Sequence, residues 1–280
     1  MIKVSLIQTS QNRRYELKRF IVSLASQAYI DLKEVQLIFI DQEDNNDIIE
    51  PIGELVDLKI IKSPHCSLSH ARNLGLPFVK GKIVGFPDDD CWYEIDTLKK
   101  VIDFFEKNKN YGGLTGKGIN ENDILTHVFP IDPQEVTSEK RCAAISYTMF
   151  FRYCKDVRFN EDIGVGSPYN LGAGEETDYM LQLMEQQKIR IYYAPSIIVR
   201  HPALIDYPDK SMLLKKTYSY SRGAGYLMKL HNFSLTYYVR SFLRPLGGII
   251  IYALKFDLYN VKKYTLVIKG LLEGFCFTKK

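Results

Sequence analysis

The first hundred residues alternate between two hydrophobic periodicities, and this alternation constrains the fold more than any other feature of the chain. Short apolar runs with the composition of strands occur at 4–8, 35–40, 58–61 and 82–86. Apolar residues at helical spacing fill the segments 14–27, 69–76 and 97–107. Strands that alternate with helices predict an α/β fold with a mostly parallel central sheet, in which ligand sites lie at the carboxyl ends of the strands.

Residues 111–200 are predicted from weaker patterns. The glycine-rich stretch at 112–118 predicts loops, and a helix is expected from Glu175 to Met184. Three further strands are predicted, at 141–151, 189–193 and 197–199.

The C-terminal part is helical by pattern from residue 209 onward. Residues 235–250 place one wide apolar face on a helix, which Pro245 is expected to kink. We therefore expect a domain at 1–205 that carries the chemistry, followed by a helical, basic and amphipathic extension at 206–280.

Composition excludes several classes of protein. With 280 residues, of which 46% are hydrophobic and 25% charged, the chain is globular rather than disordered. No apolar run reaches the roughly 20 residues of a membrane-spanning helix, and the N-terminus enters the first strand without the pattern of a signal peptide. Five scattered cysteines without Cys-x-x-Cys spacing favour a reducing cytoplasm over a disulfide framework or a zinc ribbon; they are Cys66, Cys91, Cys142, Cys154 and Cys276.

The charge is distributed unevenly along the chain. Residues 201–280 carry 13 Lys and Arg against 4 Asp and Glu, whereas residues 1–200 carry 24 against 29. A basic, aromatic tail on an acidic body predicts an anionic partner, either lipid or nucleic acid. The chain lacks an RNA-binding aromatic signature, which disfavours nucleic acid. The alternative is a packed helical cap whose lysines are merely solvated.

Three adjacent carboxylates, Asp88, Asp89 and Asp90, directly follow the apolar run at 82–86. Because adjacent carboxylates repel one another, a bound Mg²⁺ or Mn²⁺ would stabilise them, and oxygen ligands suit both ions. The alternative is a solvated acidic turn or a cap for the next helix. His201 ends a predicted strand and would join the metal ligands only if it lies beside this cluster; otherwise it is a structural histidine.

A second acidic cluster, Glu175, Glu176 and Asp178, follows the glycine hinge at 172–174. One of these carboxylates is a candidate general base, whereas the alternative is a structural role at a helix N-terminus, where the helix dipole favours negative charge. Neither a phosphate-binding P-loop nor a Gly-x-Gly-x-x-Gly turn follows the first strand, which disfavours P-loop hydrolysis and common dinucleotide binding.

The order of these segments resembles family 2 glycosyltransferases of GT-A fold. The resemblance rests on five segments in order: Val4–Arg13 with its following helix, Phe39-Ile-Asp41, Leu68–Gly75, Phe86–Asp90 and Gly172–Asp178, closed by Pro195 and His201. It covers about the first 200 residues and implies a GT-A nucleotide-diphospho-sugar transferase fold. Three positions depart from the family's pattern. Gln42-Glu43-Asp44-Asn45 stands where Asp-Gly-Ser is usual, Ser67 stands where glycine is usual, and Glu175-Glu176 stands where a Glu-Asp pair is usual.

The resemblance also implies roles for individual residues. Donor-binding positions would be Thr9, Arg13, Asp41, Arg72, Asp88 and Asp89. Metal ligands for Mn²⁺ or Mg²⁺ would be Asp90, Asp88 and His201. Glu176 would be the catalytic base, with Glu175 and Asp178 as the next choices.

The implied function is an inverting transfer of a sugar from a nucleotide-diphosphate donor, a UDP-sugar, to a hydroxyl of a glycan or of a lipid-linked acceptor. It would serve surface polysaccharide synthesis, at the cytoplasmic face of the membrane, with peripheral membrane contact through 206–280 and no nucleic acid. This hypothesis requires Asp41, Asp90, His201 and the carboxylates at 175–178 to surround one cleft. The alternatives are a sugar-phosphate nucleotidyltransferase and a non-catalytic membrane-binding protein.

Overall fold

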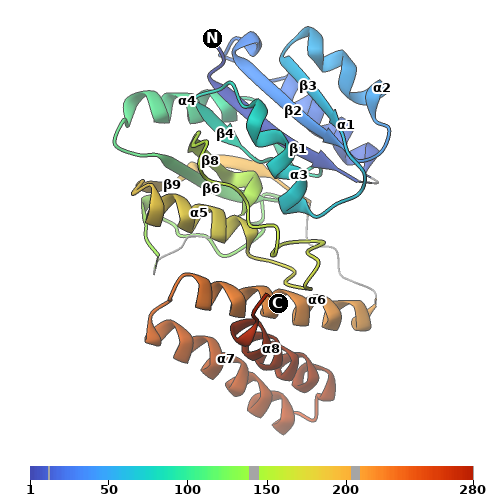
Figure 1. Ribbon diagram of the computed structural model, residues 1–280, viewed down its shortest axis with the longest axis vertical. Helices are drawn as coiled ribbons and strands as arrows, with labels where there is room; N and C mark the ends of the chain where they lie inside the picture. The colour runs from blue at the N-terminus through green and yellow to red at the C-terminus, as the bar shows by residue number, and fades with distance from the viewer. Residues whose placement is uncertain (12, 139–144, 203–208, 280) are drawn as a thin grey trace. The chain divides into compact units, whose positions relative to one another are not determined.

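The computed structural model describes residues 1–11, 13–138, 145–202 and 209–279 (Figure 1). The chain divides into two compact units. The first comprises Met1–Cys66, His70–Phe159 and Gln182–Ile205, and the second Ser67–Ser69, Asn160–Leu181 and Asp206–Lys280.

The first unit contains the sheet. The four strands that come first in the chain are parallel to one another, as the alternating pattern predicts. Strands β1 (Val4–Ser10), β2 (Val35–Asp41), β3 (Asp57–Lys62) and β4 (Ile83–Gly85) lie in the order β3-β2-β1-β4. The helices along this half are α1 (Arg14–Ala25), α2 (Asn46–Ile49) and α3 (Leu68–Gly75), with short 3₁₀ turns at Leu32–Glu34, Glu50–Glu54 and Leu76–Phe78. Ser10 pairs with Asp41, so the ends of β1 and β2 are level.

The other half of the sheet is mixed. Beyond β4 the order is β8 (Met149–Arg152), β6 (Gly113–Ile119), β9 (Ile191–Arg200) and β5 (Trp92–Tyr93), with β7 (Gln134–Val136) also paired to β9. The helix α4 (Thr97–Lys107) has the predicted bounds, and a 3₁₀ turn spans Ser146–Thr148. Because β8 is antiparallel to both β4 and β6, and β6 is parallel to β9, the carboxyl ends of β1, β2, β4 and β9 share one edge of the sheet.

The glycine-rich stretch at 112–118 was expected to form loops, and this expectation is wrong. Gly113 to Gly118 belong to β6, and a Cβ on Gly116 would lie 2.3 Å from the carbonyl oxygen of Ile197 on β9. The glycines therefore allow two backbones to approach closely rather than allowing a turn.

Two of the predicted strands at the end of this unit also differ in the structure. The segments 189–193 and 197–199 form the single strand β9, with a bulge between the pairs Thr115–Tyr193 and Lys117–Ile198. Pro195 lies within this bulge, where regular pairing is interrupted and its missing N–H is tolerated. Of the strand expected at 141–151, residues 141–144, which include Cys142, lie outside the described residues. Among the described residues 145–151, Ser146–Thr148 form a 3₁₀ turn and β8 begins at Met149.

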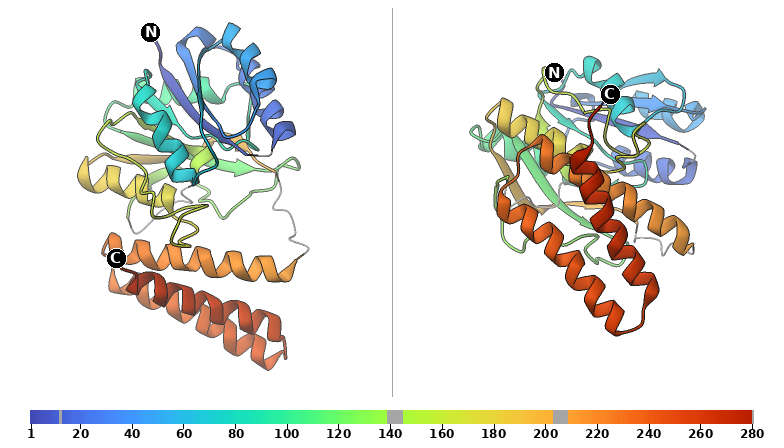
Figure 2. Two further views of the ribbon diagram at one scale, coloured as in Figure 1. Left: turned by 45° about the vertical axis from the view of Figure 1, so that its right-hand side comes forward. Right: turned by 60° about the horizontal axis from the view of Figure 1, so that its bottom comes forward.

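The second unit is helical, as the pattern after residue 209 predicts. It contains α6 (Lys210–Leu230), α7 (Leu235–Leu254) and α8 (Leu258–Cys276), and α7 continues through Pro245 (Figure 2). Two glycines bring α8 against α6, since a Cβ on Gly274 would lie 1.9 Å from the carbonyl oxygen of Arg222 and one on Gly225 would lie 2.1 Å from that of Leu271. Among the described residues, no helix combines the length and hydropathy needed to cross a membrane.

The helix α5 (Glu175–Gln186) joins the two units, because its first seven residues belong to the second unit and the rest to the first. A small apolar cluster of Ile163, Leu171 and Leu227 supports the second unit beside the start of this helix. The larger core of the first unit is formed by strand and helix side chains that include Leu6, Phe20 and Leu98.

Candidate active site

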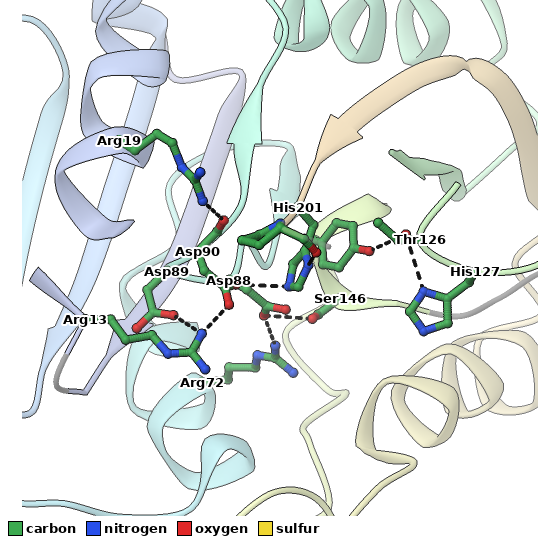
Figure 3. A network of polar contacts seen from close by, with 12 residues as sticks. Arg13, Arg19, Arg72, Asp88, Asp89, Asp90, Thr126, His127, Ser146 and His201 are labelled. Carbon is green, nitrogen blue, oxygen red and sulfur yellow. Dashed lines mark hydrogen bonds and ion pairs between the residues drawn. The ribbon is translucent and has the colours of Figure 1, made fainter. Parts of the chain in front are cut away.

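The three aspartates follow β4 at the shared carboxyl edge, and each is held by a different set of contacts (Figure 3). Asp88 Oδ1 accepts hydrogen bonds from Arg72 Nη2 at 3.1 Å and from Ser146 Oγ at 2.9 Å. The side chain of Arg72 is only 1% exposed and lies over the ring of Phe159. A buried arginine fixed by an aromatic ring orients the Asp88 carboxylate firmly.

Asp89 and Asp90 share a second arginine, Arg13, which precedes α1. Arg13 Nη1 lies 3.2 Å from Asp89 Oδ1 and also contacts Asp90 Oδ2. The main-chain oxygen of Asp90 accepts a hydrogen bond from Arg19 Nη2 at 2.8 Å. The charge of Arg13 therefore offsets the repulsion between the carboxylates, and Arg19 of α1 holds the main chain at Asp90.

His201, which directly follows β9, completes this cluster. Its Nε2 lies 3.1 Å from Asp90 Oδ1, and its ring stacks on Tyr147 at 4.7 Å between ring centres. His201 Nδ1 lies 3.0 Å from the carbonyl oxygen of Pro202. Because a carbonyl oxygen can only accept, Nδ1 carries the proton, and in the neutral ring the lone pair of Nε2 faces Asp90.

The pKa values of the residues in the cluster are shifted in different directions. Burial raises the pKa of Asp89 to about 6, although the charge of Arg13 acts in the opposite direction. Burial also acts to raise the pKa of Asp90, but His201 and Arg13 outweigh it and lower that pKa. For His201, burial lowers the pKa, yet the neighbouring Asp90 raises it above its usual value.

The donor atoms of Asp88, Asp90 and His201 fit a divalent cation. One ligand atom from each residue lies within 4.8 Å of the other two, and the set is formed by two carboxylates and an imidazole. Carboxylate oxygens with one histidine suit Mn²⁺ or Mg²⁺ better than a softer metal. Of the sequence-predicted ligands, all three are therefore brought together in the first unit.

Asp41 ends β2, as expected, but its carboxylate is already bonded within the protein. It accepts hydrogen bonds from Lys62 Nζ at 2.6 Å, from Asn45 Nδ2 at 2.8 Å and from two main-chain N–H groups of the following turn. Burial acts to raise the pKa of Asp41, but Lys62 and Asn45 outweigh it and lower that pKa. Asp41 thus fixes the turn after β2, and Thr9 lies near the end of the neighbouring β1.

Sequence reasoning missed a polar cluster beside Asp41. Gln42 Oε1 accepts hydrogen bonds from Gln11 Nε2 at 2.7 Å and from the main-chain N–H of Cys66 at 2.8 Å. Ser146 and Tyr147, which contact Asp88 and His201, were also missed. No motif marks these residues, because each reaches the site through the pairing of distant strands.

The carboxylates of the second unit lie in the first turn of α5 and differ in exposure. Glu175 and Asp178 are 2% and 1% exposed, whereas Glu176 is half-buried. Gly174 precedes them with a φ of +111°, and a Cβ there would lie 2.3 Å from Leu227. Only glycine fits this left-handed position, so it sets where the helix begins.

Helix α6 and His231, which directly follows it, supply further residues beside these carboxylates, and sequence reasoning did not find them. His231 Nε2 lies 2.9 Å from Asp178 Oδ1. Burial and the charges of Glu175 and Glu176 raise the pKa of Tyr220, although Lys216 acts against them. These groups lie 40 to 60 residues away in sequence, and no periodicity connects them.

The aspartate cluster and the α5 carboxylates belong to different units. The expectation that they surround one cleft stays a prediction.

Solved structures of other proteins share this architecture. The chain aligns with the crystal structure of S. aureus TarS 1–349 in complex with UDP-GlcNAc over 96% of its own length and 92% of that chain, with a TM-score of 0.61 and 15% identity. It also aligns with the mannosyltransferase PcManGT from Pyrobaculum calidifontis in complex with GDP-Man and Mn²⁺, over 98% and 87%, with a TM-score of 0.59 and 12% identity. The fold is therefore the GT-A fold of nucleotide-sugar transferases.

The family follows from the sequence itself. The family model of glycosyl transferase family 2 matches residues 5–159, more than half of the chain, and the chain belongs to this family. This is the family that the resemblance implied.

A curated relative extends the comparison. The chain is 26% identical over 154 residues to the Escherichia coli UDP-Glc:alpha-D-GlcNAc-diphosphoundecaprenol beta-1,3-glucosyltransferase WfaP. The match covers 54% of this chain and 56% of the relative, so it spans little more than half of either protein.

Proposed function

We propose that this glycosyltransferase moves a sugar from a UDP-sugar to a hydroxyl of a glycan or of a lipid-linked acceptor, with inversion at the anomeric carbon. The observation that carries the proposal is the convergence of Asp88, Asp90 and His201 within 4.8 Å at the carboxyl edge of the sheet, in a chain of this family.

Asp88, Asp90 and His201 are the proposed ligands of a divalent cation, Mn²⁺ or Mg²⁺. When bound, the cation supplies positive charge that stabilises the departing nucleoside diphosphate. Arg72 and Arg13 keep the carboxylates in place, and the Nδ1 proton of His201 on Pro202 leaves Nε2 available as a ligand. The support for a metal is the donor set itself, together with the Mn²⁺ in the PcManGT structure.

Glu176 is the proposed catalytic base. In a single displacement, the acceptor oxygen forms a bond to the anomeric carbon while the bond from that carbon to the diphosphate oxygen breaks. The hydroxyl proton passes to the Glu176 carboxylate. Glu175 and Asp178 are nearly inaccessible, so an acceptor hydroxyl reaches Glu176 more easily than either neighbour.

The donor is proposed to contact Thr9, Arg13, Asp41 and Arg72, with Asp88 and Asp89 near its ribose and phosphates. All six residues lie in the first unit, at or close to the carboxyl ends of β1, β2 and β4. UDP is favoured as the nucleotide because the TarS structure holds UDP-GlcNAc and WfaP is named for UDP-Glc.

The acceptor is proposed to be lipid-linked, because WfaP is named for a diphosphoundecaprenol acceptor. Such an acceptor places the reaction in surface glycan synthesis, at the cytoplasmic face of the membrane. Residues 206–280 are the part of the chain proposed to contact that membrane.

Isothermal titration calorimetry with UDP and with GDP, each with and without Mn²⁺, tests the proposal directly. We expect UDP to bind, with an affinity that rises at least tenfold when Mn²⁺ is present. A screen of UDP-sugars for slow hydrolysis that requires Mn²⁺ then identifies the donor. Release of pyrophosphate from UTP and a sugar phosphate, without hydrolysis of any nucleotide sugar, would instead show a nucleotidyltransferase.

A further inference from the structure

Helix α7 carries an apolar stripe that the protein leaves uncovered. Six side chains form it, at helical spacings of three and four residues: Leu235, Val239, Leu243, Leu246, Ile250 and Leu254. Each is between 45% and 76% exposed. We call these six residues the α7 stripe.

The stripe marks a division in the wide apolar face that the sequence predicted at 235–250. Tyr238, Phe242 and Ile249 of that face are partly buried, and the hydroxyl of Tyr238 donates a hydrogen bond to the carbonyl oxygen of Met228. A Cβ on Gly248 would lie 2.8 Å from the ring of Tyr264 on α8. One side of α7 therefore packs within the unit, and the α7 stripe lies on the other side.

The stripe continues into the turn that joins α7 and α8. Phe256 and Leu258 are 90% and 79% exposed there. An apolar patch of eight large side chains on one helical hairpin is more than the scattered single residues that a soluble surface normally shows.

Positive charge surrounds this apolar surface. Arg240 and Arg244 lie one turn apart on α7, at the edge of the stripe, and Lys255 and Lys262 lie at the turn and on α8. All four are exposed, and none of them forms an ion pair with any residue that the structure describes. Helix α7 contains no acidic residue, and between residues 235 and 279 only Asp257 and Glu273 are acidic.

We propose that the α7 stripe lies in the interface of an anionic lipid bilayer, with α7 parallel to the membrane surface and its flanking cations on lipid headgroups. An exposed apolar face bordered by arginine and lysine is the pattern of helices that insert to the depth of the acyl-chain boundary. Anionic headgroups supply the negative charge that helix α7 lacks.

A second copy of the chain fits the same surface less well. Pairing two α7 stripes would bring Arg240 and Arg244 of each copy to the interface, with no carboxylate on either helix to match them. Charge complementarity therefore favours lipid over self-association. The inference deepens the proposed function, since a lipid-linked acceptor is reached from the membrane surface, but its test does not require turnover.

Vesicle sedimentation of the full chain tests the inference. We expect binding to vesicles of equal parts phosphatidylcholine and phosphatidylglycerol, at least tenfold weaker binding to phosphatidylcholine alone, and weakening of the anionic binding by 500 mM NaCl. The triple variant Leu243→Ser, Leu246→Ser, Ile250→Ser should lose at least tenfold in affinity for the anionic vesicles.

The matched control changes three apolar residues of similar exposure in the first unit: Val22→Ser, Leu55→Ser and Ile95→Ser. It should bind vesicles as the wild type does. A second variant, Arg240→Gln with Arg244→Gln, keeps the α7 stripe intact. Its affinity for anionic vesicles should fall several-fold, whereas its binding to neutral vesicles should not change. Circular dichroism checks that each variant is folded.

Several outcomes would overturn the inference. Equal binding to neutral and anionic vesicles would show that the four cations do not contribute to binding. Equal binding by the stripe variant and the control would show that the α7 stripe does not contact the vesicles. A concentration-dependent dimer that the stripe variant abolishes, without vesicle binding, would show a protein interface instead. Mn²⁺-dependent hydrolysis of a UDP-sugar by the stripe variant separates the two proposals, because it tests the proposed function without a membrane.

Discussion

His231 Nε2 lies 2.9 Å from Asp178 Oδ1, and the two side chains are 4% and 1% exposed. The contact joins the end of α6 to the first turn of α5, two residues after Glu176. Asp178 therefore anchors the helix that carries the proposed base, and its buried carboxylate is unsuited to receive a proton from a bulky acceptor.

The replacement His231→Ala should destabilise the protein by about 3 kcal/mol, because it removes the buried imidazole that contacts the buried Asp178 carboxylate. His231→Gln, which retains a donor, should restore part of the stability. Urea unfolding of the three proteins measures the difference. Equal free energies of unfolding for wild type and His231→Ala would show that the contact contributes nothing.

Glu176→Gln should lower the transfer rate by about 10³-fold and leave the free energy of unfolding unchanged. The amide keeps the size of the side chain but cannot accept the hydroxyl proton at neutral pH. Calorimetric UDP binding should stay within twofold of wild type. If transfer persists at a tenth of the wild-type rate or more, another group is the base.

His201→Ala should weaken Mn²⁺ binding at least tenfold, because it removes one of three converging ligands. Titration followed by electron paramagnetic resonance of free Mn²⁺ measures this affinity. His127→Ala, which removes an imidazole of the same unit that is outside the ligand set, is the matched control. Removal of metal with EDTA should abolish hydrolysis of the UDP-sugar, and added Mn²⁺ should restore it. A wild-type Mn²⁺ affinity in His201→Ala would exclude this ligand.

Asp41 gives a pH-dependent prediction. Its folded pKa is lowered, so the stabilisation from its ionised form is present above the pKa of an unfolded aspartate, about 3.9, and is lost as pH falls through the lower folded value. Asp41→Asn should therefore lose about 2 kcal/mol of stability at pH 7, and this deficit should shrink below pH 4.

Urea unfolding at pH 7 and at pH 3.5 measures the effect of Asp41→Asn. Asp44→Asn is the control, because Asp44 also contacts Lys62 but its side chain is 87% exposed. A deficit of the same size at both pH values would show that the charge of Asp41 is not its source.

Much of the first unit was predictable because its signals are local. The periodicity of 4–8, 35–40 and 97–107 reports which side chains face a core, and the structure has β1, β2 and α4 at these places. The cluster of Asp88, Asp90 and His201 was predictable in part, since acidic residues after a buried strand must lie at the edge of the sheet.

The partners of those residues were not predictable. Ser146 reaches Asp88 from 58 residues away, and Tyr147 stacks on His201 from a stretch without a motif. Likewise, the sequence showed the apolar face at 235–250 but not which half of it the unit buries. Such contacts depend on packing between distant elements, which no local pattern encodes.

The glycines of β6 also could not be placed from a local pattern, because their role depends on packing against β9. Glycine favours turns by composition, yet Gly116 lies in a strand because a larger residue would meet the backbone of β9. Gly116→Ala should destabilise the protein by about 3 kcal/mol, since a Cβ at 2.3 Å from the Ile197 carbonyl oxygen forces two paired strands apart.

Gly247→Ala is the matched control, because no atom lies within 4 Å of the added Cβ and the residue is inside α7. This change should stabilise that helix by about 0.5–1 kcal/mol through the higher helix propensity of alanine. Thermal unfolding followed by circular dichroism should thus show opposite shifts for two identical substitutions. A melting temperature for Gly116→Ala at or above that of wild type would mean that β6 and β9 are not paired this closely in solution.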